Sequence, residues 1–281
     1  MQYTEHPPSQ ALADYLECVW FVRDNEASFA NRAAERVLPD GCIEWILHLG
    51  APFQRWTQAE GWQLQSRSFV VGELTQFLLL QPSGPAAVMG VRFKPGGAYR
   101  FLSLPLDLLT DKTKATEDVW GPDARYLEEA VFSARTDVER TRLIEGFLLQ
   151  RLLISARPRF DAAITHIISS RGRMRMGQLA DSVGWSRRQL EREFRASAGL
   201  TPKALARIIR FQNLLRLVGE GEVREWANLA LESGYADQPH MVREFRAFCG
   251  QSPTERQARA AGHLASHFLS PRRLTILLGL S

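Results

Sequence analysis

The first hundred residues alternate between short apolar runs and residues that form turns. The apolar runs are rich in β-branched and aromatic side chains, and Pro and Gly separate them, as in Pro39-Asp40-Gly41. Short runs of this composition between turn signals are typical of β-strands. The pattern predicts an antiparallel sheet or small barrel over residues 10–100, with strands at 18–23, 42–50, 68–73, 77–81 and 87–93.

From residue 105 the spacing of the apolar residues changes. Residues 124–133 and 138–154 place apolar side chains three and four positions apart, which is the spacing of an amphipathic helix. We expect these helices either to close off the N-terminal domain or to pair two subunits. Residues 156–159 are predicted to form a linker, because Pro158 disfavours a helical conformation in the residue before it.

The chain up to residue 260 then has the pattern of short helices, at 160–170, 176–183, 186–197, 202–218, 226–233, 237–248 and 253–260. Compact DNA-binding domains use helices of this length. We therefore expect a multidomain α+β protein. Its predicted parts are a sensing or dimerisation domain at 1–156 (β-rich at 10–100, helical at 105–156), an all-α tandem helix-turn-helix domain at 157–260, and a disordered tail at 261–281.

The helical part contains an internal duplication. Residues 179–202 and 229–253 share a Leu-Ala pair, a Gly followed by an aromatic residue, and a Glu-Phe-Arg-Ala segment. The first half of the pattern recurs 50 positions later and the second half 51 positions later, so the second copy is one residue longer. Each copy has the order of helix, glycine turn and helix that a helix-turn-helix unit needs.

The second helix of each copy has one polar face rich in arginine. Ser186 and Asp237 are candidate N-caps of these helices. Apolar residues four positions apart mark the buried side: Leu190 and Phe194, then Met241 and Phe245. At 100° per residue, the other side carries Arg188, Gln189, Arg192 and Arg195 in one copy and Pro239, His240, Arg243 and Arg246 in the other. Exposed Arg, Gln and His side chains are suited to reading base edges in the major groove.

The segment between the copies, residues 202–218, has the pattern of one continuous helix. Its apolar stripe consists of Leu205, Ile208, Ile209, Leu215 and Val218. Such a helix spans about 24 Å, which could hold two reading helices about one DNA turn apart, roughly 34 Å. One polypeptide would then read two successive segments of the major groove.

Basic residues concentrate in the same part of the chain. Residues 157–260 hold 18 Lys and Arg against 11 Asp and Glu, whereas the rest of the chain holds 17 against 20. Lys203 is the only Lys among these 18, and the Arg guanidinium suits both phosphates and guanine edges. A solvated basic surface would have the same composition, so charge alone does not decide between the two readings.

Residues 160–260 resemble the AraC/XylS family of transcription regulators. The first unit carries the motif A-x-x-x-G-[WY]-S-x-x-x-L-x-R-x-F-R, from Ala180 to Arg195. The matching residues of the second unit include Gly234, Tyr235, Phe245, Gly250 and Pro253. In that family a long helix joins two recognition helices that both enter the major groove. The resemblance implies base contacts for Arg188, Glu191, Arg192, Gln238, His240 and Arg243.

Three further arginines complete the candidate set. Arg195 and Arg246 suit phosphate contacts or salt bridges better than base reading. Glu191 could instead pair with Arg187 or Arg195, four residues away on either side. The expected DNA-binding residues are therefore Arg187, Arg188, Glu191, Arg192, Arg195, Gln238, His240, Arg243 and Arg246.

The N-terminal part departs from the usual pattern of that family, in which a sugar-sensing jelly roll precedes the DNA-binding unit. Residues 38–50 and 90–111 instead resemble a poorly characterised domain with no established ligand, so the ligand-binding residues are unknown. Trp20, Trp45, Trp56 and Trp62 could line a pocket, although aromatic residues on strands more often form core. Arg92 and Lys94 could hold an anion, although solvated charges at a tight turn are the simpler interpretation.

No pattern of catalytic or metal-binding residues is present. The six His lack H-x-H and H-E-x-x-H spacings, and Cys18, Cys42 and Cys249 lack a C-x-x-C spacing. We therefore expect no enzyme activity, no metal and no cofactor. Two alternatives stay open: a protein-interaction scaffold, and a thiol- or ligand-responsive sensor or enzyme centred on Cys42. Asp40 and Glu44 argue against a reactive thiolate, because nearby carboxylates raise the pKa of a thiol.

The chain is expected to act in the cytoplasm and without a membrane. Its N-terminus lacks a basic stretch followed by an apolar run, and its longest apolar runs are too short to span a bilayer. Double-stranded DNA is the expected partner. RNA polymerase, a small-molecule effector and a second copy of the chain are left open as further partners.

Overall fold

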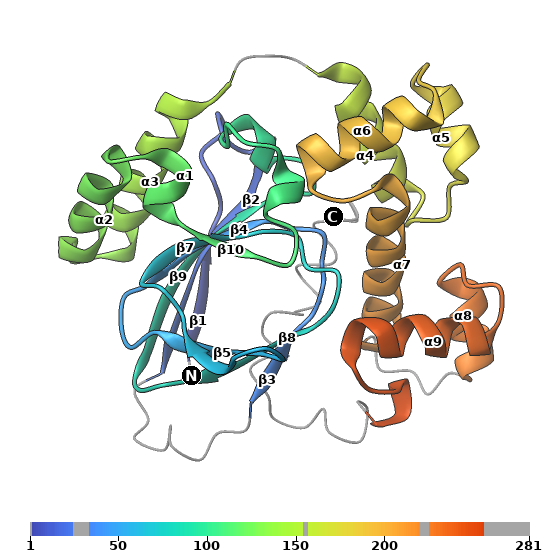
Figure 1. Cartoon of the computed structure of the whole chain (residues 1–281), viewed down its shortest axis with the longest axis horizontal. Coiled ribbons are helices and arrows are strands. Elements are labelled where there is room, and N and C mark those ends of the chain that lie inside the picture. The colour runs from blue at the N-terminus through green and yellow to red at the C-terminus, as the bar shows by residue number, and fades with distance from the viewer. Residues whose placement is uncertain (1, 25–33, 154–156, 220–224, 256–281) are drawn as a thin grey trace.

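The computed structural model describes residues 2–24, 34–153, 157–219 and 225–255. Within these ranges, ten strands and three α-helices form an N-terminal part, and six α-helices form a C-terminal part. The two parts lie side by side and contribute to one continuous hydrophobic core (Figure 1). The architecture is the predicted α+β combination of a β-rich domain and an all-α domain.

The N-terminal strands form two antiparallel sheets. The larger sheet has the order β1-β2-β9-β4-β7-β10, and the smaller has the order β3-β8-β5-β6. The larger sheet consists of β1 (Gln2–His6), β2 (Leu16–Asp24), β9 (Ala86–Phe93), β4 (Glu44–His48), β7 (Ser68–Val71) and β10 (Thr113–Ala115). The smaller sheet consists of β3 (Glu35–Val37), β8 (Leu78–Pro82), β5 (Phe53–Thr57) and β6 (Gly61–Leu64).

Strand β2 shows that the larger sheet is buried on both faces. Trp20 belongs to a cluster shared with the smaller sheet, whereas its neighbours Val19 and Phe21 belong to the main core. Successive side chains of a strand point to opposite faces, so a strand buried on both faces is apolar throughout. Trp20 also lies across Gly90, its partner on β9, where any Cβ would overlap the indole ring.

Three helices cover the outer face of the larger sheet: α1 (Thr116–Trp120), α2 (Asp123–Ser133) and α3 (Asp137–Arg151). Trp45 on β4 anchors them. Its ring centroid lies 4.5 Å from that of Trp120 and 5.7 Å from that of Phe147. Its Nε1 donates a hydrogen bond to Oγ1 of Thr116 at 2.9 Å. These helices therefore close off the N-terminal part, which is one of the two predicted roles.

The C-terminal helices are α4 (Pro158–Ser169), α5 (Met176–Ser182), α6 (Arg187–Ala198), α7 (Pro202–Gly219), α8 (Trp226–Glu232) and α9 (Gln238–Cys249). Each lies within two residues of its predicted bounds. The pairs α5–α6 and α8–α9 pack at opposite ends of α7 (Figure 1). Most of the helix predicted at 253–260 and the whole tail at 261–281 lie outside the described residues.

Phe160 on α4 joins the two parts. It is only 1% exposed, and its ring lies 5.3 Å from the ring of Tyr99 and 5.2 Å from that of Phe194. The next residue, Asp161, accepts a hydrogen bond from Oη of Tyr99 at 3.1 Å and pairs with Nη2 of Arg100 at 3.0 Å. An aromatic cluster and an ion pair thus connect the β-rich part to the first helices of the all-α part.

Five short strands do not appear in the sequence-based prediction: β1, β3, β5, β6 and β10. Their sequences contain many polar residues, and several of their side chains are exposed or half-buried. A strand with a solvated face gives only a weak apolar signal. Strand β10 also interrupts the segment at 105–156 that was predicted to be helical, because it pairs with β7 at the edge of the larger sheet.

We expect Phe160→Ala to lower the free energy of unfolding by about 3–5 kcal/mol, because it leaves a cavity between Tyr99 and Phe194. Urea unfolding followed by circular dichroism measures this loss. Tyr126→Ala, which removes a side chain that is 73% exposed, is the control and should change stability by about 0.5 kcal/mol or less. A loss below about 1 kcal/mol for Phe160→Ala would contradict its anchoring role.

Candidate nucleic-acid interface

The first helix-turn-helix unit consists of α5, a turn at Gly184 and α6. Gly184 has a φ of +64°, a conformation that glycine adopts without the steric cost of a Cβ. Ser186 and Gln189 form a capping box: the Ser186 hydroxyl accepts from the N–H of Gln189, and the Gln189 side chain accepts from the N–H of Ser186. Leu190 and Phe194 are buried, which fixes the outward side of α6.

The second unit repeats this order with α8, a turn at Gly234 and α9. Gly234 has a φ of +88°. Asp237 caps α9, since its Oδ1 accepts from the N–H of His240 at 2.7 Å. Met241 and Phe245 are buried, so the outward side of α9 is fixed in the same way as that of α6. The predicted pair of helix-turn-helix units is confirmed.

The residues predicted to contact DNA lie on the outward sides of these two helices. On α6, the exposed residues of the set are Arg187, Arg188, Glu191, Arg192 and Arg195, which we call the α6 face. On α9, Gln238, Arg243 and Arg246 are exposed and His240 is half-buried, and we call these four the α9 face. The structure thus gathers the nine residues into one surface on each helix. Their contacts with DNA remain a prediction.

Two carboxylates behind these faces were missed by the sequence reasoning. Glu193 pairs with Arg192 at 3.1 Å. Glu244 pairs with Arg207 of α7 at 2.6 Å, and its Oε1 lies 3.7 Å from Nε2 of His240. The two occupy the same position of the repeat, so the recurrence of Glu-Phe-Arg was the available signal. Each holds one residue of its face close to the helix.

Both recognition helices end against the N-terminal part. Each helix is followed by a left-handed glycine, Gly199 with a φ of +73° and Gly250 with a φ of +67°. The carbonyl of Gly199 accepts from Oγ1 of Thr110 at 2.5 Å. A Cβ on Gly250 would overlap the ring of Phe77. The N-terminal ends of α6 and α9 therefore point away from the sheets (Figure 1).

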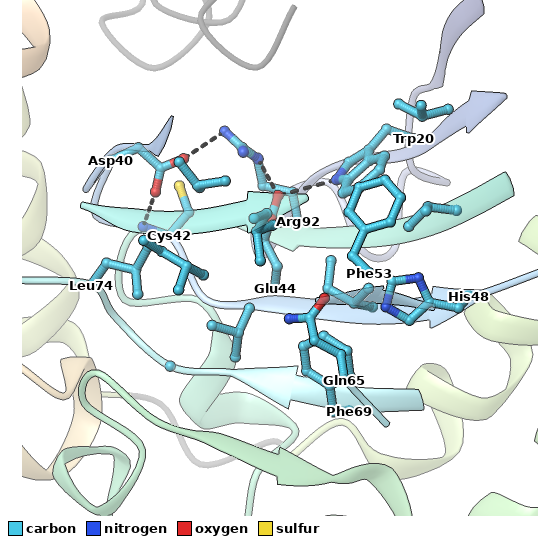
Figure 2. A pocket seen from close by; sticks show the side chains of 18 of the residues that line it. Trp20, Asp40, Cys42, Glu44, His48, Phe53, Gln65, Phe69, Leu74 and Arg92 are labelled. Atoms are coloured by element: carbon cyan, nitrogen blue, oxygen red, sulfur yellow. Dashed lines mark hydrogen bonds and ion pairs between the residues drawn. The ribbon is translucent and has the colours of Figure 1, made fainter. Parts of the chain in front are cut away.

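A cavity lies between the two sheets (Figure 2). It contains about 760 Å³ of space that no atom fills, including its opening to solvent. Apolar side chains form most of its wall, among them Ile46, Phe53, Phe69, Leu78, Leu80 and Val88. Of the four tryptophans considered above, Trp20 lines this cavity, Trp45 lies in the main core and Trp56 is 44% exposed.

Arg92 forms the polar end of the cavity together with two carboxylates (Figure 2). It is 4% exposed, so the interpretation of Arg92 as a solvated turn residue is wrong. Its Nη1 lies 2.8 Å from Oδ2 of Asp40, and its Nε donates to Oε1 of Glu44 at 2.8 Å. Burial raises the pKa of Glu44 above its ordinary value, and Arg92 opposes this rise. These charges therefore stabilise one another out of contact with bulk water.

Cys42 lies beside this polar end. It is 6% exposed, and its N–H donates to Oδ1 of Asp40 at 3.0 Å. Burial, and then the charge of Asp40, raise the pKa of the Cys42 thiol well above its usual value. Since the thiolate is the reactive form, these surroundings do not favour the thiol-sensor alternative.

Across 2–24, 34–153, 157–219 and 225–255, no three His, Cys, Asp or Glu side chains gather as metal ligands. None of the helices in those ranges is both long enough and apolar enough to cross a membrane.

The sequence matches two domain families. Residues 4–114 match a domain of unknown function (DUF6597), and this match extends over the strands of both sheets. Residues 179–259 match a helix-turn-helix domain, and this match extends over both helix-turn-helix units. No protein with curated annotation matches the sequence.

Similar solved structures include ToxT from Vibrio cholerae. One such structure is 13% identical, has a TM-score of 0.48 and covers 93% of this chain and 100% of ToxT. Another is a structure of ToxT bound to (E)-4-(8-methylnaphthalen-1-yl)but-3-enoic acid. It is 13% identical, has a TM-score of 0.47 and covers 91% of this chain and 98% of ToxT.

His48 lies at the apolar end of the cavity (Figure 2). Its titration tests how far the cavity wall excludes water from this side chain. Burial lowers its pKa from 6.5 to about 4. Between these values the unfolded chain binds a proton that folded His48 does not. This residue should therefore reduce the free energy of unfolding by about 2 kcal/mol between pH 7 and pH 5.

The measurement compares urea unfolding of the wild type and His48→Leu at both pH values. The comparison is needed because burial raises the pKa of Glu17 to about 7, which makes its contribution change with pH in the opposite direction. We expect the wild type to lose about 2 kcal/mol more than the variant on acidification. Equal losses would show that His48 is not held neutral by its surroundings.

Proposed function

We propose that this chain, an AraC-type helix-turn-helix regulator with a DUF6597 domain in front of its DNA-binding domain, controls transcription by binding a specific sequence of double-stranded DNA. The duplication carries the proposal: the α6 face and the α9 face present arginines at opposite ends of α7. A protein-interaction scaffold would not require arginine on both faces, whereas reading two segments of one groove would.

Affinity and sequence choice come from different residues of the two faces. Contacts with phosphates supply affinity that does not depend on sequence and falls as salt rises. We assign these contacts to Arg187, Arg195 and Arg246. Base edges in the major groove supply the sequence choice, and we assign their reading to Arg188, Glu191, Arg192, Gln238, His240 and Arg243.

Helix α7 sets the distance between the two faces. Its 18 residues span about 27 Å, and successive major-groove segments on one side of DNA lie about 34 Å apart. The recognition helices pack at the ends of α7, so they lie at a separation suited to two successive segments. Both N-terminal ends point away from the sheets, which leaves them free to enter the groove.

The N-terminal domain supplies the regulatory input in this proposal. We place the domain at residues 1–156 and the DNA-binding domain at 157–260, since α3 ends at Arg151 and α4 begins at Pro158. A small-molecule effector would occupy the cavity between the sheets. RNA polymerase and a second copy of the chain are the further partners proposed. We assign the protein no catalytic activity and no cofactor, and place it in the cytoplasm with its DNA.

We expect Arg192→Ala and Arg243→Ala each to cost about 1–3 kcal/mol at the preferred DNA site, because each removes a contact with a base edge. Site selection from a random library, followed by fluorescence anisotropy, gives the affinities for preferred and mismatched sites. The loss of affinity should be smaller at DNA sites that already carry a mismatch at the base that the substituted arginine contacts. An equal loss on every sequence would contradict base reading.

Arg195→Ala provides the contrasting case. A phosphate contact should weaken binding by a similar factor on all sequences and lower the slope of log affinity against log salt by about 1. Arg125→Ala removes an exposed side chain of α2, a helix that lies on the other side of the sheets from both faces (Figure 1), and should leave affinity and slope unchanged. A sequence-dependent loss for Arg195→Ala would move that residue to the base-reading group.

The spacing set by α7 is testable on the DNA side. Insertion of about five base pairs between the two half-sites turns the second one to the opposite side of the duplex. We expect affinity to fall to that of a single half-site, and insertion of about ten base pairs to leave the second half-site out of reach of a rigid α7. Undiminished binding to either spacing, measured by gel shift, would show that α7 does not fix the separation.

A further inference from the structure

The polar end of the cavity holds more carboxyl groups than cations. Arg92 is the one ionised cation among the described residues that line the cavity, and both Asp40 and Glu44 pair with it. Glu17 and Glu73 are buried close enough to interact with the same guanidinium. Four carboxyl groups therefore share one guanidinium.

This imbalance affects the ionisation of the cluster. Burial raises the pKa of Glu17 to about 7 and raises the pKa of Glu44 and of Glu73 above the ordinary value. A nearby cation would favour the ionised forms of these groups. A positive group that entered the cavity would thus lower these pKa values and pair with the carboxylates that form as it binds.

Glu44 also has an oxygen available for a ligand. Its Oε1 accepts from both Arg92 and Trp20, at 2.8 and 3.1 Å. Its Oε2 has no hydrogen-bond partner within the part of the chain that the structure describes. Since Glu44 lines the cavity, this oxygen is suited to accept from an N–H donor inside it.

An anionic ligand suits this end less well. Arg92 directs its Nη1 to Asp40 and its Nε to Glu44, so an anion would compete with two carboxylates already at 2.8 Å. It would also be repelled by them at short range and in a poorly solvated site. The charge pattern therefore selects the sign of the ligand's head group.

We propose that the cavity binds an amphipathic organic cation, a primary amine with an aromatic or aliphatic body, whose ammonium group lies against Asp40 and Glu44. The body packs among Phe53, Phe69 and Val88. This assignment deepens the proposed function and rests on it for one point, that the effect of the ligand is a change in DNA binding.

The loop that carries Asp40 is packed on α7. The carbonyl of Pro39 accepts from Nε2 of Gln212 at 2.5 Å, and Gly41 lies against apolar side chains of α7. Asp40 stands between these two contacts. An ammonium group that draws Asp40 away from Arg92 therefore moves a loop in direct contact with the helix that spaces the two faces.

A second part of the cavity wall reaches the end of α9. Leu74 and Leu78 line the cavity, and Phe77 between them packs against Gly250. A ligand that spreads these leucines displaces the ring on which α9 ends. The cavity is thus coupled both to the spacing helix and to the second recognition helix.

Three probes of equal length test the sign of the head group: 4-phenylbutylamine, 4-phenylbutan-1-ol and 4-phenylbutanoate. Isothermal titration of the full chain measures the affinity of each. We expect the amine to bind about tenfold more tightly than the alcohol and the carboxylate to bind most weakly. Absence of binding by all three, or a carboxylate that binds as tightly as the amine, would overturn the proposal.

Asp40→Asn and Glu44→Gln test the position of the ammonium group. Each variant should bind the amine no more tightly than the alcohol, while its affinity for the alcohol stays within about twofold of the wild type. Glu60→Gln removes an exposed carboxylate outside the cavity and should keep the amine preference. A variant that binds the alcohol normally and still prefers the amine contradicts the assignment. Should a variant not fold, the probe series on the wild type decides.

DNA affinity in the presence and absence of 4-phenylbutylamine tests the coupling. We expect the amine to change the affinity of the wild type for its selected site by about threefold or more, and to have no effect in Gln212→Leu. An amine that binds without changing DNA affinity overturns the coupling. DNA binding without amine selectivity refutes this inference alone, whereas amine selectivity without DNA binding refutes the proposed function alone.

Discussion

The relative position of the α6 face and the α9 face depends on one continuous helix, α7. A recognition helix of 12 residues, such as α6 or α9, is only marginally stable by itself in water. Packing therefore holds each in place: Phe194 rests on Phe160 of α4, and Phe245 rests on Phe211 of α7. Because Phe245 and Phe248 of the second unit both pack on Phe211 of α7, a change in the position of that helix changes the position of the α9 face.

Three of the contacts between the N-terminal part and this framework involve a glycine, and all three are close. Gly199 at the end of α6 meets the backbone near Leu106, the loop around Gly41 meets α7, and Gly250 at the end of α9 meets Phe77. The atoms at these glycine contacts are packed too closely to shift gradually past one another. A displacement of the sheets must therefore move α6, α7 or α9 as well, or break the contact. Two of the three places adjoin the wall of the cavity. The regulation of DNA binding that we propose for the cavity therefore needs no long path of coupled residues.

The sequence predicted the helical half well and the cavity poorly, for physical reasons. Short amphipathic helices and glycine turns are local signals, and the duplication supplied each of them twice, as Gly184 and Gly234 illustrate. The polar end of the cavity is assembled from three strands and a loop. Nothing near Arg92 in the chain indicates that Asp40 and Glu44, about fifty residues earlier, will enclose it. The burial of Arg92 follows from the pairing of β4 with β9. That pairing depends on the register of the two strands and not on any local sequence pattern.

The buried charges at that end are best explained by a role in ligand response. A buried ion pair seldom stabilises a fold more than apolar residues of the same volume, and here two further acids, Glu17 and Glu73, add to the desolvation cost. A ligand changes a conformational equilibrium only as far as it binds one state better than the other. A cluster with more carboxyl groups than cations provides that difference, because a cation that enters favours the ionised form of acids whose pKa burial has raised. Ionisation of these acids by an entering cation is thus the source of free energy that we propose moves the loop packed on α7.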